Sequence, residues 1–239
     1  MPIAFTETGP IFFVHVPKTG GTSMEDYLLR RFGPLALTDV NKQHGVRGTY
    51  LMAAVNHLSA IDLREMIPVQ SILVFALVRD PLQRLLSEYR WQSGASRMSR
   101  LSFSSWLRVM DACVRIDPRA YGNHVRPQAD LVPAGAEVFR LEDGFGPAVA
   151  RIDAVTNSIA SNIEVGYFKA RRKAQDDIPV FREDAALIRG MHGADYDRFC
   201  YPAPALSEYP PDPHAALRGL VGRGLARGVM WRQRRLWLQ

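Results

Sequence analysis

The stretch that most constrains the fold of this chain is IFFVHVPKTGGTSMEDYLLRRFG, from Ile11 to Gly33. Its first residues, 11–16, are apolar, β-branched and aromatic, which is typical of a buried strand. A glycine-rich turn follows, and then apolar residues recur at helical spacing until Gly33 and Pro34 predict the helix end: Met24, Tyr27, Leu28 and Phe32. A glycine-rich turn that leads into a helix gathers main-chain N–H groups around an anion. The stretch therefore predicts a strand-loop-helix unit that binds a phosphate-like group.

The order of residues in the loop PKTGGTS indicates which kind of anion the loop binds. Gly20 and Gly21 let the backbone approach a ligand closely, and Thr22 and Ser23 add hydroxyl donors. In the nucleoside triphosphatase loop, a lysine directly precedes the helix and the next hydroxyl binds Mg²⁺. Here Lys18 precedes the glycines, which favours a smaller, metal-free anion. The alternative is an ordinary glycine turn with an exposed lysine.

A second apolar run, ILVFALV at 72–78, has no polar residue and is typical of a strand buried on both faces of a parallel sheet. Asp80 and Pro81 then suit the N-cap and first residue of another helix. A further strand at 137–143 and helices near 148–154 and 183–191 continue the alternation. We therefore predict an α/β fold with a doubly wound parallel sheet, in which ligands bind beyond the carboxyl ends of the strands.

The motif LVRDPLQRLLSEY places Arg79 at a strand end and Ser87 eight residues later, inside the next helix. Eight helical residues rise about 12 Å, so an arginine that reaches along the helix is able to share one phosphate with Ser87. The alternative is that Arg79 pairs with a neighbouring carboxylate and Ser87 faces solvent. Arg84 and Arg90, on the same helix, are expected to be surface charges.

Two separate anion sites suit a nucleotide with phosphates at both ends of its ribose, and here the sequence resembles a known family. HVPKTGGTS resembles the 5′-phosphosulfate loop of sulfotransferases that use 3′-phosphoadenosine 5′-phosphosulfate (PAPS), and LVRDPLQRLLSEY resembles their 3′-phosphate motif. The resemblance is closest to the Golgi-type carbohydrate sulfotransferases, such as the heparan 2-O-sulfotransferases, and their bacterial relatives. It extends from Ile11 to Tyr201 through four further motifs: VNHLSAIDLREMI, NHVRPQ, VFRLED and DYDRFCY.

The resemblance implies a P-loop-like α/β fold, PAPS as co-substrate, and no metal. It assigns the nucleotide contacts to Lys18, Thr19, Gly20, Gly21, Thr22, Ser23, Arg79 and Ser87. Lys18 also stabilises the charge that grows on the leaving oxygen.

The general base implied by the resemblance is His57, with His44 as the fallback. His15 is expected to pack or cap. For His124, Arg126 and Gln128, contact with cofactor or acceptor is left open.

Other functions remain alternatives at this stage. One is an atypical P-loop kinase of a nucleotide or small molecule, which needs Mg²⁺ and ATP. Another is a non-catalytic nucleotide-binding protein. No nucleic acid is expected, because no recognition motif of basic and aromatic residues is found outside the tail. The acceptor of a sulfotransferase here is a glycan, glycolipid or small molecule.

The C-terminal residues 213–239 differ from the rest of the chain, and we predict a sulfotransferase domain at 1–212 followed by a basic amphipathic tail. The formal charge is +6. The tail contains six arginines and, after Asp212, no acid, so the body is nearly neutral. A helical face with Leu217, Leu220, Val221 and Leu225, and Trp231 and Trp237 beyond it, leaves three alternatives: docking on the body, an anionic membrane surface, or acceptor binding.

The start MPIAFTETGP lacks the basic and apolar regions of a secretory signal, and no apolar run is long enough to span a membrane. We therefore expect a cytoplasmic protein, with peripheral attachment at the inner membrane face as one alternative. Cys113 and Cys200 are expected to be reduced, buried thiols.

Overall fold

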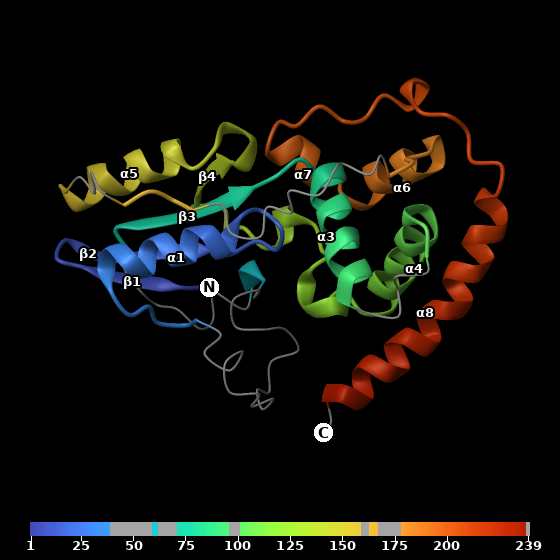
Figure 1. Cartoon of the computed structure of the whole chain (residues 1–239), viewed down its shortest axis with the longest axis horizontal. Coiled ribbons are helices and arrows are strands. Elements are labelled where there is room, and N and C mark those ends of the chain that lie inside the picture. The colour runs from blue at the N-terminus through green and yellow to red at the C-terminus, as the bar shows by residue number, and fades with distance from the viewer. Residues whose placement is uncertain (39–58, 62–70, 96–100, 159–162, 167–177, 238–239) are drawn as a thin grey trace. The chain divides into compact units, whose positions relative to one another are not determined.

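The computed structural model describes residues 1–38, 59–61, 71–95, 101–158, 163–166 and 178–237 (Figure 1). The chain forms two compact units, each built from two segments. Unit 1 comprises Met1–Arg79 and Gln128–Arg172, and unit 2 comprises Asp80–Pro127 and Lys173–Gln239. The predicted boundary between residues 212 and 213 stays a prediction.

Unit 1 contains a four-stranded sheet in the order β1-β2-β3-β4. The strands are β1 (Ile3–Thr6), β2 (Gly9–Val14), β3 (Leu73–Val78) and β4 (Glu137–Arg140). β2 pairs in parallel with β3, and β3 with β4, whereas β1 is an antiparallel edge strand. The predicted α/β fold with a mainly parallel sheet is confirmed. β1 was not predicted, because four residues carry too little pattern to separate a strand from a loop.

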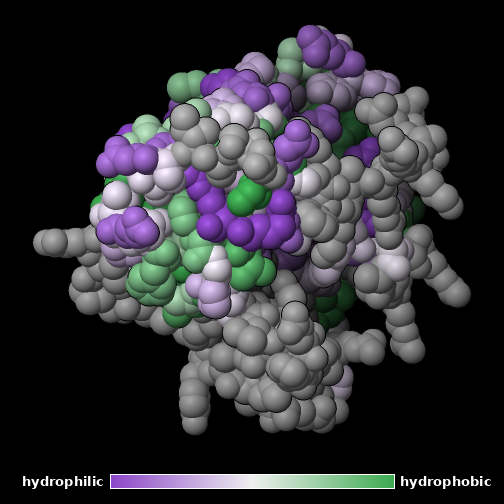
Figure 2. All heavy atoms as spheres, turned by 60° about the vertical axis from the view of Figure 1, so that its left-hand side comes forward, coloured by the Kyte–Doolittle hydropathy of each residue, from purple (hydrophilic) through white to green (hydrophobic). Residues whose placement is uncertain are grey.

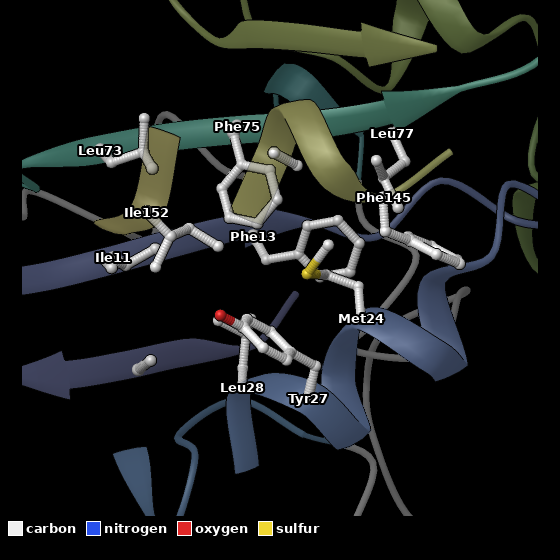
Figure 3. Close-up of a cluster of buried hydrophobic side chains, with 12 residues drawn as sticks. Ile11, Phe13, Met24, Tyr27, Leu28, Leu73, Phe75, Leu77, Phe145 and Ile152 are labelled. Carbon is white, nitrogen blue, oxygen red and sulfur yellow. The ribbon is translucent and has the colours of Figure 1, made fainter. Parts of the chain in front are cut away.

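Two helices of unit 1 pack against one face of this sheet. They are α1 (Gly21–Phe32) and α5 (Gly146–Thr156). In the core between them, Phe13 and Phe75 lie with ring centroids 4.9 Å apart. Figure 3 shows the labelled members of this core, which point into the space between helix and strand: Ile11, Phe13, Met24, Tyr27, Leu28, Leu73, Phe75, Leu77, Phe145 and Ile152.

The alternate residues of β3, Ala76 and Val78, are also fully buried, so β3 is covered on both faces as its unbroken apolar sequence predicts. α1 ends as predicted at Gly33, whose φ is 82° and whose N–H donates to the Leu29 carbonyl at 3.0 Å. Short 3₁₀ turns, η5 (Gln128–Asp130) and η6 (Leu141–Asp143), flank β4.

The surface that faces the viewer in Figure 2 carries hydrophilic and hydrophobic residues side by side. Among the exposed apolar side chains of unit 1 are Phe5 on β1 and Leu29 on α1. Scattered apolar side chains of this kind are normal for a protein surface and point to no particular partner.

Unit 2 is helical in its described residues. Its helices are α3 (Pro81–Ala95), α4 (Phe103–Ile116), α6 (Arg182–Met191), α7 (Gly193–Arg198) and α8 (Ala215–Trp237), with the 3₁₀ turns η4 (Ala120–Asn123) and η7 (Leu206–Glu208). α3 begins as predicted, because the Asp80 carboxylate accepts from the Gln83 N–H at 2.9 Å. α4 was not predicted. Its sequence signal was Ser102, whose hydroxyl accepts from the Ser105 N–H at 3.3 Å as an N-cap.

The prediction that Arg84 is a surface charge is wrong. Its side chain is fully buried, and its guanidinium donates to the carbonyls of His124 at 3.0 Å and Arg126 at 2.6 Å. Burial lowers the pKa of Arg84, and the carboxylates of Asp195 and Glu88 oppose that shift. Sequence pattern does not show this role, because the carbonyls that need a donor lie about 40 residues away along the chain.

Cys113 and Cys200 are not joined in a disulfide, and only one of them follows the prediction of buried thiols. Cys113 is buried on α4, whereas Cys200 is exposed. No helix within the described residues is both long enough and apolar enough to cross a bilayer.

Candidate functional site

The loop between β2 and α1 has a fixed backbone. Lys18 has a φ of 69° and Gly20 a φ of 84°, so two of its residues are left-handed. This conformation costs a lysine about 1–2 kcal/mol, and it persists only where surrounding contacts hold it. One such contact is the Thr19 hydroxyl, which is buried and donates to the Val16 carbonyl at 2.9 Å. The loop is therefore shaped in advance of any ligand.

The N-terminus of α1 is suited to an anion. The Gly20 carbonyl accepts from the N–H groups of Ser23 at 3.0 Å and Met24 at 3.2 Å. The N–H groups of Gly21 and Thr22 precede these, where a helix has no internal acceptor for them. The helix dipole adds partial positive charge at this end, and the first turn contains no acidic residue. Of the predicted hydroxyl donors, Thr22 is exposed, whereas Thr19 and Ser23 are buried.

Gly21 is required by the side chain beneath it. A Cβ atom at Gly21 would lie 2.1 Å from both Cδ2 and Nε2 of His15. His15 is buried, its Nδ1 lies 2.6 Å from Glu25 Oε1, and its ring stacks on Phe13. His15 therefore packs under the loop, as predicted. Its partner Glu25 was missed, although a carboxylate in the second turn of the following helix is the signal that points to it.

Arg79 follows β3 directly and lies next to the loop. Its Nη1 is 3.5 Å from the Lys18 carbonyl oxygen. Because β2 and β3 are adjacent and parallel, their carboxyl ends meet at one edge of the sheet. The loops after β2 and β3, which contain Lys18 and Arg79, therefore lie at the same edge of the sheet within unit 1.

Gln128 holds the backbone of Arg79 from both sides. The Arg79 N–H donates to Gln128 Oε1 at 3.0 Å, and Gln128 Nε2 donates to the Arg79 carbonyl at 2.8 Å. Gln128 is fully buried. The structure therefore gives this residue a contact that supports the Arg79 backbone and that the sequence did not predict. Whether Gln128 also contacts cofactor or acceptor stays open.

Ser87 lies on α3 in unit 2 and is half-buried. A phosphate shared by Arg79 and Ser87 stays a prediction. His57 and His44, the predicted base and its fallback, lie outside the described residues.

His124 is held by a buried chain of polar groups in unit 2. Its Nδ1 lies 2.9 Å from Glu88 Oε2, and Glu88 Oε1 accepts from Gln92 Nε2 at 2.8 Å. Gln92 Oε1 in turn accepts from the Trp106 indole N–H at 2.8 Å. The His124 ring also stacks on Trp91, with centroids 5.3 Å apart. The sequence signal that was missed is the pair Glu88 and Gln92, one helical turn apart on α3.

Arg126 contributes its carbonyl to the Arg84 guanidinium, and the role of its own guanidinium stays open. Within the described part of the chain, no three His, Cys, Asp or Glu side chains gather as metal ligands would.

Comparison with known proteins finds one family. A model described as the sulfotransferase family matches residues 1–140, which is more than half of the 239 residues. The matched region includes the loop before α1, Arg79, Ser87 and the NHVRPQ segment. No curated protein and no solved structure matches the chain.

Proposed function

We propose a donor and an acceptor for this chain, which belongs to the sulfotransferase family and so transfers sulfuryl groups. The donor is PAPS, and the acceptor is a hydroxyl of a carbohydrate or glycolipid. The observation that supports this proposal is the pairing of two loops in unit 1. The Arg79 guanidinium lies 3.5 Å from the backbone of Lys18, next to a helix N-terminus that suits an anion. Two cations and a helix N-terminus at one sheet edge suit a donor with more than one anionic group.

The two ends of the nucleotide have separate contacts in this proposal. The N–H groups at the start of α1, the Thr22 hydroxyl and Lys18 bind the 5′-phosphosulfate. Thr19 and Ser23 belong to the same loop. Their side chains are buried, and the Thr19 hydroxyl holds the loop through its bond to the Val16 carbonyl. Arg79 and Ser87 bind the 3′-phosphate. A guanidinium suits this role because it donates two parallel hydrogen bonds to two phosphate oxygens.

The proposed reaction is an in-line displacement at sulfur. The acceptor oxygen forms a new bond to sulfur while the bond from sulfur to the bridging phosphate oxygen breaks. The electron pair of that bond stays on the phosphate, which leaves as adenosine 3′,5′-bisphosphate. Negative charge grows on the bridging oxygen, so the Lys18 ammonium stabilises the transition state more than the ground state. His57 accepts the proton of the acceptor hydroxyl, a role supported by the family resemblance of its sequence position.

A transfer assay tests the proposal. Purified protein is incubated with PAPS labelled in its sulfur, without Mg²⁺, against a panel of glycans, glycolipids and small hydroxyl compounds. We expect label in a sulfate ester of a glycan or glycolipid. We also expect Arg79→Ala to weaken binding of adenosine 3′,5′-bisphosphate by about tenfold or more, since a hydrogen bond to a charged group is worth about 1.5–3 kcal/mol. Arg189→Ala removes an exposed arginine on α6 and is the matched control.

The alternatives predict different results. Turnover that requires Mg²⁺ and ATP would favour an atypical kinase. Binding of the bisphosphate without transfer to any acceptor would favour a non-catalytic binding protein. Transfer that Arg79→Ala leaves unchanged would contradict the proposed 3′-phosphate contact.

A further inference from the structure

The C-terminal helix α8 packs within unit 2 through one side, which carries a glycine, an alanine and a methionine. α8 lies along α4 (Figure 1). Gly222, Ala226 and Met230 are buried and recur every four residues, so they form one stripe on the packed side of α8. A Cβ at Gly222 would lie 2.9 Å from Cβ and 3.0 Å from the carbonyl carbon of Arg108. The two helices therefore approach as closely as a glycine permits.

Polar contacts fix the start of the same helix. Arg218 Nη1 lies 3.0 Å from Asp212 Oδ2, just before the helix. The Arg108 guanidinium on α4, which lies 2.6 Å from Asp184 Oδ1, also reaches the same Asp212 oxygen at 3.8 Å. Asp212 and Asp184 are both buried. α8 is thus an integral part of unit 2, with one defined face turned inward. Docking on the body, one of the three alternatives for the tail, explains the buried side of α8 but not its exposed side.

The exposed apolar side chains of α8 lie outside this buried stripe, on the far side of the helix and its flanks. Leu217 precedes the buried Ala226 by nine positions, about two and a half turns, which places them on opposite sides of the helix. These apolar side chains are 43–62% exposed: Leu217, Leu220, Val221, Leu225 and Trp231. The stripe they form is called the outer face below. An exposed apolar stripe of this kind marks an interaction surface.

The outer face is accompanied by positive charge. Arg223 and Arg227 are exposed on α8, and Arg232, Arg234 and Arg235 follow in the sequence. No acidic residue occurs from His214 to Gln239. The partner must therefore present apolar surface to the leucines and negative charge to the arginines.

We propose that the outer face of α8 binds the surface of an anionic phospholipid bilayer. The acyl region takes up the leucines, the valine and the tryptophan, and the headgroups pair with the arginines, because an arginine side chain is long enough to extend to the headgroup level. An acidic glycan satisfies the arginines but leaves the apolar stripe in water. A second copy of the chain covers the stripe but brings two sets of arginines together. A bilayer satisfies both requirements at once.

Co-sedimentation of the full chain with vesicles tests this proposal. We expect binding to phosphatidylcholine vesicles that contain about one third phosphatidylglycerol, and little binding to phosphatidylcholine alone, because each arginine near such a surface contributes about fivefold to the affinity. Leu217→Ser combined with Leu220→Ser and Leu225→Ser should reduce binding by about tenfold or more for each leucine. Arg223→Gln with Arg227→Gln should reduce it by about thirtyfold.

The matched control is Leu29→Ser, the same change at an exposed leucine of α1. These substitutions lie on exposed positions, whereas deletion of 213–239 would uncover the buried face of α4 and is a poor test. Circular dichroism establishes that each variant is folded. A further measurement is the tryptophan emission. In wild type it should shift to the blue with anionic vesicles, and Trp231→Phe should lose part of that shift.

Several results would overturn the proposal. One is wild-type protein that stays in the supernatant with anionic vesicles, and another is full binding by the folded leucine variant. A dimer in sedimentation velocity that the leucine variant abolishes would assign the face to a second copy. Retention on an acidic polysaccharide that the leucine variant leaves unchanged, without vesicle binding, would assign the arginines to a glycan. None of these results depends on the sulfate donor, so they are separable from failure of the proposed function.

Discussion

Substitution of Gly21 by alanine should disturb both the stability of unit 1 and the affinity of the anion loop. The new Cβ would lie 2.1 Å from two atoms of the His15 ring, whereas carbon atoms in ordinary contact are about 3.5–4.0 Å apart. Either the ring or the start of α1 must therefore move by about 1.5 Å. The ring is buried and held at 2.6 Å by Glu25, so it does not move freely.

The expected loss of stability in Gly21→Ala is that of overpacking a buried site, which lowers the free energy of unfolding by about 1–3 kcal/mol. The backbone itself is not the obstacle, since Gly21 is the first residue of α1 and has no positive φ. The assay is urea unfolding followed by circular dichroism, combined with calorimetric titration of adenosine 3′,5′-bisphosphate. We expect a lower unfolding midpoint and weaker binding, because the displaced segment carries the N–H groups that face the anion.

Gly146→Ala is the matched control. Gly146 is the first residue of α5, and a Cβ there would meet nothing within 4 Å. Its stability should change by no more than about 0.5 kcal/mol. In a His15→Ala background the ring is absent, so adding Gly21→Ala should cost much less than it does in wild type. A Gly21→Ala protein as stable as the Gly146→Ala protein, or strictly additive effects in the double variant, would refute the reasoning.

Two further predictions concern the base and the thiols. His57→Ala should abolish sulfuryl transfer yet leave binding of adenosine 3′,5′-bisphosphate nearly intact, and loss of both or of neither would contradict the role of His57 as base. Burial raises the pKa of the Cys113 thiol to about 12, so at pH 8 a mild alkylating reagent should modify the exposed Cys200 and spare Cys113 until the protein unfolds. Mass spectrometry of tryptic peptides measures this difference, and equal labelling of both thiols in the native protein would show that Cys113 is accessible.

Local signals predicted the parts of the candidate site that lie close together in sequence. The loop from Pro17 to Ser23, the strand before Arg79 and the helix cap at Asp80 each depend on a few consecutive residues. Their physical basis is local, because φ preferences, caps and apolar runs act over one or two turns.

Long-range partners were not predictable in the same way. The clamp of Gln128 on Arg79 joins residues 49 positions apart, and the burial of Arg84 depends on carbonyls 40 and 42 positions away. A sequence pattern shows that a side chain is polar, but not which backbone groups will need its hydrogen bonds.

The sequence by itself determined that α8 has a helical pattern, a run of arginines and an apolar stripe. Only the tertiary structure decided which side of that helix is buried. The side that packs carries Gly222 and Ala226, because small residues let α8 approach Arg108 on α4, and the leucines consequently remain outside. Hydrophobicity predicts which side chains favour burial. Close packing between two particular surfaces decides which side chains are buried.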